Sequence, residues 1–204
     1  SVTCIPPDTV DGLGNTGGAN TGVDLDQWLA DAYAQTAAID KISPEEVKAY
    51  RLAADQGQAD AQYSLGKLYA MGAGVLKDPV EAERLFVLAA KQGNPEHQSL
   101  LASMYYSGGE IGQDVTKAVQ WYTIAAKQGY SPSQASLGQI YADGVHTSAD
   151  KVLAHMWFNV ADACGYTSMG NYRDDLERGM SHDEIVEATQ RARQCLESSF
   201  ARCY

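Results

Sequence analysis

The sequence predicts an all-α solenoid built from antiparallel helix pairs, and two observations lead to this prediction. Residues 61–93 have the pattern of two helices joined by a turn, and the same pattern recurs thirty-six residues later and again after a further thirty-six. A fixed period of this length indicates stacked repeats that bury their apolar faces against one another. The recurring residues are Leu65, Tyr69, Gly72, Asp78, Ala82 and Gly93; Leu101, Tyr105, Gly108, Asp114, Ala118 and Gly129; and Leu137, Tyr141, Gly144, Asp150, Ala154 and Gly165.

Composition and charge restrict the classes of protein and partner. Of the 204 residues, 45% are hydrophobic and 20% are charged, as is usual for a soluble domain. Apolar runs extend over only a few residues, whereas a membrane-spanning helix needs about 20. The formal net charge is −11, and no basic cluster exceeds Arg191–Arg193. Nucleic acid is therefore not expected as a partner, because phosphate binding needs a basic face. The net negative charge is interpreted either as a means of keeping the protein soluble or as a sign of a basic partner.

The N-terminal part is predicted to be an irregular arm followed by a degenerate repeat. Residues 1–23 are rich in glycine and contain Pro6-Pro7, which is the composition of a linker. Helical periodicity begins near Asp24, so a first repeat is expected over 24–60, with its second helix opened by the capping box of Ser43–Glu46. Three further repeats are expected over residues 61–96, 97–132 and 133–168.

Most of the repeated polar and small residues have a local structural explanation. Glycine after a first helix suits a left-handed terminating residue, aspartate before a second helix suits an N-cap, and glycine within a first helix allows close packing. The aromatic pairs Trp121-Tyr122 and Trp157-Phe158 are assigned to the core. The terminators are Gly72, Gly108 and Gly144, the N-caps are Asp78, Asp114 and Asp150, and the packing glycines are Gly66 and Gly138.

Residues 169–204 are predicted to form a C-terminal pair of capping helices. Ser181–Glu184 form a second capping box, and the helix that follows has one apolar face that contains Ala188, Ala192 and Cys195. Such a helix suits the end of a solenoid, where the last repeat must be covered.

The four cysteines indicate an oxidising compartment and a disulfide framework. Four cysteines allow three pairings. We prefer Cys195–Cys203, which ties the chain end to the last helix, together with Cys4–Cys164, which fixes the arm on the fourth repeat. The alternative joins Cys164 to Cys195 and Cys4 to Cys203. The first residue is Ser1 rather than Met, which fits removal of a signal peptide. The predicted location is therefore periplasmic or secreted.

No catalytic, cofactor or metal pattern is found in the sequence. The four histidines form no HxxxH or HxxE pair, and there is no CxxC, GxSxG, Walker or Rossmann motif. The sequence therefore predicts a protein that is not an enzyme, with no catalytic residues, no cofactor and no metal.

The period and the motif resemble those of the Sel1-like repeat, a 36-residue relative of the tetratricopeptide repeat. The resemblance rests on A-x3-L-G-x2-Y-x2-G-x-G-V-x2-D and the paired alanines and glycine that follow in residues 61–93. It covers about residues 25–168, although the fourth repeat has His146 at the second turn glycine. The tail to residue 204 is similar to the capping segment of bacterial members. The resemblance implies a right-handed superhelix that binds proteins or peptides, and bacterial members are often exported.

In tetratricopeptide-like arrays the first helices line the concave face. Positions two, six, nine and ten after the start of each first helix point away from the core positions, and here they form a polar groove with two tyrosines and a methionine. Tyrosine and methionine are enriched at interfaces, although simple solvation is the alternative. The predicted partner-binding residues are Gln27, Asp31, Tyr63, Lys67, Met71, Ser99, Ser103, Tyr106, Gln139 and Asp143. The same positions also hold Ala34, Gln35, Ala70, Ser107, Ala135 and Ala142.

The sequence therefore predicts a monomeric, non-enzymatic module of the cell envelope that binds another protein. The sharpest hypothesis is an immunity protein that neutralises a type VI secretion toxin such as a phospholipase. The alternatives are an envelope assembly or signalling scaffold and a secreted host-interaction factor. No motif separates these roles.

Overall fold

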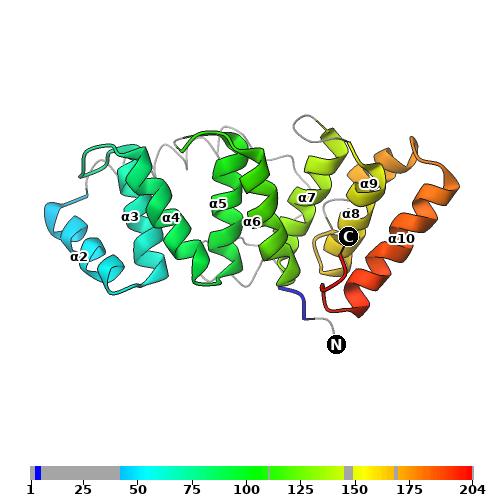
Figure 1. Cartoon of the computed structure of the whole chain (residues 1–204), viewed down its shortest axis with the longest axis horizontal. Helices are drawn as coiled ribbons and strands as arrows, with labels where there is room; N and C mark the ends of the chain where they lie inside the picture. The colour runs from blue at the N-terminus through cyan, green and yellow to red at the C-terminus, as the bar shows by residue number, and fades with distance from the viewer. Residues whose placement is uncertain (1–2, 6–41, 110, 145–148, 168–169, 204) are drawn as a thin grey trace, which may run out of the picture. The chain divides into compact units, whose positions relative to one another are not determined.

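The computed structural model describes residues 3–5, 42–109, 111–144, 149–167 and 170–203. The chain divides into two compact units, one made of residues 11–92 and the other of residues 1–10 and 93–204. We name them the α2–α4 unit and the α5–α10 unit after the helices that they contain (Figure 1). Most of the predicted arm, the first helix of the first repeat and His146 lie outside the described residues.

The described part of the chain is all-α, as predicted. The α2–α4 unit holds α2 (Pro44–Asp55), α3 (Ala59–Met71) and α4 (Pro79–Lys91). The α5–α10 unit holds α5 (Pro95–Ser107), α6 (Val115–Lys127), α7 (Ser131–Asp143), α8 (Lys151–Ala163), α9 (Gly170–Glu177) and α10 (His182–Glu197). Within the described residues, β-structure is limited to one isolated bridge between Ile5 and Tyr130.

The residues predicted to begin and end helices do so. Asp78 accepts hydrogen bonds from the backbone N–H groups of Val80 and Glu81 at the start of α4. The first helices α3, α5 and α7 end at glycines in the left-handed conformation, where a side chain would be strained. Both capping boxes are present, one at Ser43 before α2 and one at Ser181 before α10. The remaining predicted N-caps, Asp114 and Asp150, also accept backbone hydrogen bonds.

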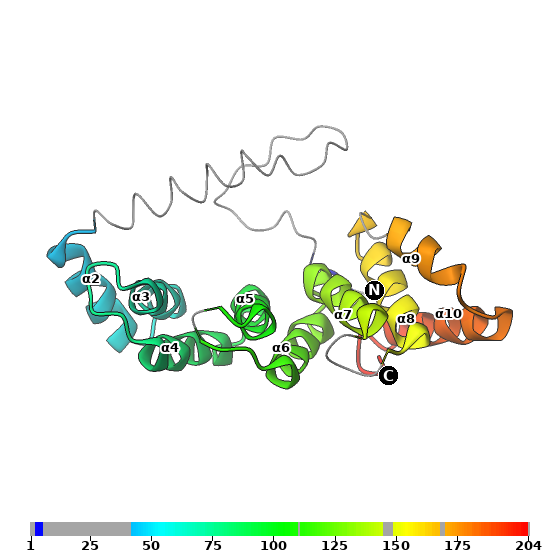
Figure 2. The ribbon, with the colours of Figure 1, turned by 90° about the horizontal axis from the view of Figure 1, so that it is seen from above.

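Each repeat packs its first helix against its second. In Figure 2, α5 lies beside α6 and α7 beside α8, and α8 also contacts α9 and α10. Glycine allows the close approach that was predicted: a Cβ atom on Gly66 would lie 2.8 Å from the Phe86 ring, and one on Gly138 would lie 2.5 Å from the Phe158 ring. Substitution of either glycine would therefore force the neighbouring aromatic ring to shift.

Glutamine pairs connect the C-terminal ends of α4 and α6 to the first helix of the same repeat. The Nε2 atom of Gln92 donates to Oε1 of Gln62 over 2.8 Å, and that of Gln128 donates to Oε1 of Gln98 over 2.6 Å. Thirty-six residues after Gln128 the chain has Cys164 instead. A disulfide bond therefore occupies the position of the next glutamine pair.

The N-terminal segment is joined to the α5–α10 unit by that disulfide. Cys4 is bonded to Cys164, as preferred from the sequence, with Cα atoms 5.2 Å apart. The next residue, Ile5, donates its N–H to the carbonyl oxygen of Gly129 over 2.8 Å and forms the parallel bridge with Tyr130. The loop between α6 and α7 therefore pairs with the start of the chain.

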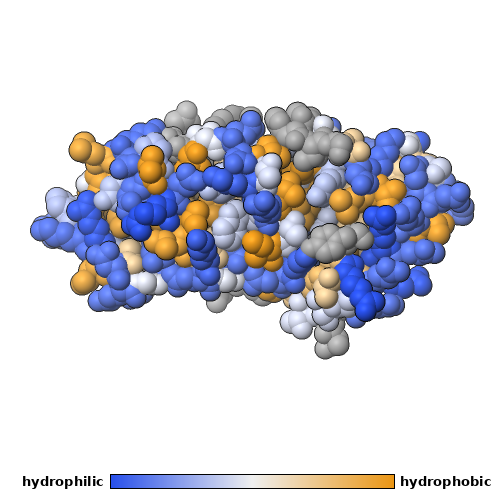
Figure 3. Space-filling model, viewed as in Figure 1, coloured by the Kyte–Doolittle hydropathy of each residue, from blue (hydrophilic) through white to orange (hydrophobic). Residues whose placement is uncertain are grey.

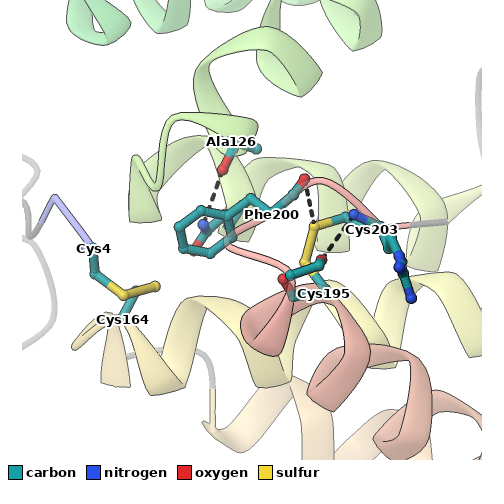
Figure 4. Close-up of a disulfide and its surroundings, with 9 residues drawn as sticks. Cys4, Ala126, Cys164, Cys195, Phe200 and Cys203 are labelled. Carbon is teal, nitrogen blue, oxygen red and sulfur yellow. Dashed lines mark hydrogen bonds between the residues drawn. A yellow bond between two sulfur atoms is a disulfide. The ribbon is translucent and has the colours of Figure 1, made fainter. Parts of the chain in front are cut away.

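The C-terminal tail also contacts the loop between α6 and α7. Cys195 and Cys203 form the second disulfide, and Phe200 between them is 3% exposed (Figure 4). A Cβ atom on Gly129 would lie 2.9 Å from the Phe200 ring and 2.6 Å from the carbonyl oxygen of Thr3. Gly129 is thus the point where both ends of the chain pack against the third repeat.

Candidate protein-binding site

The predicted binding residues within the described ranges all lie on first helices. They are exposed or half-buried, as their positions require, but Gln27 and Asp31 lie outside the described residues. Two alanines expected to face away from the core, Ala70 and Ala135, are instead 6% and 3% exposed. The reason is that a first helix packs on two sides: α3 contacts α2 as well as α4, and α7 contacts α6 as well as α8. The accessible stripe is therefore narrower than predicted.

In the α2–α4 unit the predicted residues Tyr63, Lys67 and Met71 share α3. The Tyr63 ring is half-buried, and its centroid lies 5.4 Å from that of Phe86. The Nζ atom of Lys67 lies 6.0 Å from the Tyr63 centroid, at the limit of a cation–π contact. Tyr63 thus contributes to packing as well as to the surface, whereas Lys67 and Met71 are exposed.

In the α5–α10 unit a pocket of about 270 Å³ brings together three of the predicted residues, Tyr106, Gln139 and Asp143. We call it the tyrosine pocket, because three tyrosines on three different helices line it. Its full lining is Tyr106 from α5, Tyr122 from α6, Ser136, Gln139, Ile140 and Asp143 from α7, and Tyr172 from α9.

Tyr122 is a core residue whose polar end reaches the tyrosine pocket. It is 5% exposed, and its hydroxyl group hydrogen-bonds with Ser103 and Ser136. Burial raises the pKa of the Tyr122 phenol, and the two serine hydrogen bonds offset part of that increase. The phenol therefore stays neutral at physiological pH, and the hydrogen bonds fix the position of the ring.

Tyr172 is positioned by polar contacts of α9 rather than by apolar burial. None of the described side chains of α9 is buried. Instead, Glu177 Oε1 lies 2.6 Å from Nε2 of His155, a residue of α8 that is 2% exposed. Arg173 donates to Asp162 and Asn159, both also on α8, over 3.4 Å. These contacts hold α9 on α8 and leave the Tyr172 side chain 55% exposed at the pocket.

Four pocket residues are absent from the predicted binding set: Tyr122, Ser136, Ile140 and Tyr172. As part of an aromatic pair, Tyr122 is predicted to lie in the core, and only its hydroxyl, absent from Phe86 and Phe158 in the same register, indicates a polar neighbour. The consensus fades before Tyr172, so no periodic signal locates it.

Among the described residues, no three His, Cys, Asp or Glu side chains gather closely enough to hold a metal ion. None of the described helices is both long and apolar enough to cross a lipid bilayer. The face shown in Figure 3 carries apolar side chains in separate patches between hydrophilic ones. A mixed surface of this kind resembles non-obligate interfaces, which are about as apolar as the rest of a protein surface.

The fold and the site together define a helical repeat protein with a polar, tyrosine-containing binding surface. The sequence profile of the Sel1 repeat matches residues 59–94, 96–130 and 131–161, so the chain belongs to the Sel1 repeat family. Sel1 repeats are protein–protein interaction modules, and the family is typically a non-catalytic scaffold.

Two solved structures are similar to this chain. A Sel1 repeat protein from Oxalobacter formigenes is 32% identical, with a TM-score of 0.53, over 64% of this chain and 98% of that protein. The second, c5321, is described as a protective antigen of uropathogenic Escherichia coli strains with an SLR fold. It is 26% identical, with a TM-score of 0.51, over 76% of this chain but only 42% of its own length. No curated protein matches this chain.

Proposed function

We propose that this protein is a non-enzymatic binding module that holds a partner protein at the tyrosine pocket and the adjacent exposed residues of α5 and α7. The observation that carries the proposal is the convergence of Tyr106, Gln139 and Asp143, predicted independently from their repeat positions, on one pocket. Tyrosine is among the residue types that most often carry binding energy at interfaces.

We further propose that the module works in the periplasm or outside the cell, after removal of a signal peptide. The two disulfides support this location, because they persist mainly in oxidising compartments. In that setting we propose an immunity function, in which the protein occupies the surface of a delivered toxin such as a type VI phospholipase. A binding fold with an acidic surface is suited to blocking another protein.

Capture of a partner from envelope extract by the purified full chain, followed by mass spectrometry, tests the proposed function. The change to make is Tyr106→Ala, which removes a half-buried pocket ring. We expect at least tenfold weaker partner binding, a loss of about 1.4 kcal/mol or more, with unchanged helicity by circular dichroism. Lys67→Ala changes a predicted binding residue on α3. We prefer it to Tyr63→Ala, because Tyr63 also packs on Phe86 and its loss would disturb the core.

The outcome of the capture distinguishes the specific roles. One tight stoichiometric partner whose toxicity is relieved by co-expression supports the immunity role. Many weak partners without any such rescue support a scaffold instead. Unchanged affinity of the Tyr106→Ala protein would move the binding surface away from the tyrosine pocket.

A further inference from the structure

The lining of the tyrosine pocket restricts the chemistry of what can enter it. Three of its seven residues are tyrosines, one is Asp143, and none is basic. The volume of about 270 Å³ is slightly below the range of pockets that hold drug-sized ligands. It therefore suits one side chain of a partner rather than a separate small molecule.

A cationic group matches this lining better than an anionic or apolar one. The faces of aromatic rings attract cations, and the pocket is lined by Tyr106 and Tyr172 as well as by the polar end of Tyr122. The carboxylate of Asp143 adds a full negative charge at the pocket. An anion would meet that carboxylate without a basic partner in the lining, and an apolar group would leave Asp143 and Gln139 without matching contacts.

The basic residue of this chain that is closest in sequence to a residue of the tyrosine pocket already has acidic partners. Arg173 follows Tyr172 directly, but its guanidinium contacts Asp162, Asp174 and Glu177 at 3.4 to 3.9 Å. These contacts draw the guanidinium toward acidic groups of α8 and α9. Arg173 therefore already has acidic partners outside the lining of the tyrosine pocket.

The geometry points to an arginine side chain of the partner as the occupant of the tyrosine pocket. This inference rests on the proposed function, because it names the partner group that the same surface would bind. A guanidinium can stack on a tyrosine face and at the same time donate two parallel hydrogen bonds to a carboxylate, which the ammonium of lysine cannot do. The net charge of −11 would also attract a basic partner surface over longer distances.

Titration of the isotope-labelled full chain with capped arginine, followed by NMR, tests the inference. We expect shifts of Tyr106, Tyr172 and Asp143 signals that saturate with a dissociation constant in the millimolar range. Capped citrulline has nearly the same shape without the charge, so it should bind at least tenfold more weakly. Equal binding of citrulline, tighter binding of capped lysine, or no shift at these residues would overturn the assignment.

Three variants locate the effect. Tyr172→Ala and Asp143→Asn should each weaken capped arginine binding about tenfold, whereas Tyr172→Phe keeps the ring and should bind nearly as well as the unmodified protein. Tyr50→Ala is the matched control, since Tyr50 is an exposed tyrosine in the α2–α4 unit. Circular dichroism should remain unchanged, because Tyr172 is 55% exposed.

The same variants separate this inference from the proposed function. If Tyr172→Ala and Asp143→Asn leave capture of the partner protein unchanged, the arginine assignment is wrong while the binding function stands. If capped arginine binds as expected but no partner is captured, the pocket binds a guanidinium while the proposed function fails.

Discussion

A single hydroxyl group separates Tyr122 from Phe86 and Phe158, the residues thirty-six positions before and after it. All three rings are buried. The additional oxygen atom at position 122 requires hydrogen bonds, which Ser103 and Ser136 supply. This one substitution within a repeated core position gives the third repeat a polar connection to the surface.

The raised pKa of Tyr122 predicts a loss of stability at alkaline pH. Above the ordinary phenol value of 10.0, the unfolded chain releases this proton while the folded chain still holds it. The free energy of unfolding should therefore fall as pH rises from about 10 through the raised pKa. Urea unfolding at several alkaline pH values measures the decline, which should be shallower in Tyr122→Phe. It should not vanish, because burial also raises the pKa values of Tyr130 and Tyr141.

Gly138→Ala tests the close packing of α7 on α8. Alanine improves helix propensity by up to about 1 kcal/mol, but its Cβ would lie 2.5 Å from the Phe158 ring. Overpacking of this kind costs about 1–3 kcal/mol, so we expect net destabilisation in urea unfolding. Gly170→Ala in α9 is the control, because a Cβ there meets nothing within 4 Å. Equal stability of the two variants would contradict the packing argument.

At the scale of whole elements, α9 differs from the first helices that precede it. The helices α3, α5 and α7 each have 13 residues and bury several side chains, whereas α9 has 8 residues and none of its described side chains is buried. Its attachment depends on the contacts of His155, Arg173 and Glu177. His155 is 2% exposed, so its contact with Glu177 is largely shielded from solvent, whereas the ion pairs of Arg173 are more exposed and contribute less stability.

The helix α10 is the opposite case, with a strong start and an apolar face. Ser181 caps it, and the Glu184 side chain accepts hydrogen bonds from the backbone and hydroxyl of Ser181. Ser181→Ala should lower the free energy of unfolding by about 1 kcal/mol. Gln190→Ala, an exposed change in the same helix, should have little effect. Thermal unfolding of both variants measures the difference, and equal melting temperatures would refute it.

At the scale of the whole chain, the two disulfides close loops of very different length. Cys4 and Cys164 are 160 residues apart, and Cys195 and Cys203 only 8. Chain-entropy estimates give about 5 kcal/mol for the longer loop and about 2.5 kcal/mol for the shorter one. Serine replacement of the first pair should therefore destabilise the protein more in urea unfolding. Peptide mapping without reduction checks the pairing, and a Cys4–Cys203 peptide would contradict it.

The sequence by itself determined the repeat architecture of this protein. Helix caps, terminating glycines and close-packing glycines depend on interactions within one repeat. The local sequence is therefore enough to predict the roles of Asp78, Gly72 and Gly66, and the thirty-six-residue period repeats these residues along the chain. The same period predicts that Tyr106, Gln139 and Asp143 face away from the core positions of their helices.

Only the tertiary structure decided which of these positions meet. Tyr122 and Tyr172 enter the tyrosine pocket from helices outside the predicted set, and Ala70 and Ala135 are withdrawn from the surface by packing on a second side. Gly129 likewise contacts both ends of the chain, at Thr3 and Phe200, and each of these residues is more than seventy positions away in the sequence. Such contacts join residues that share no local pattern, so the arrangement of the helices was needed to reveal them.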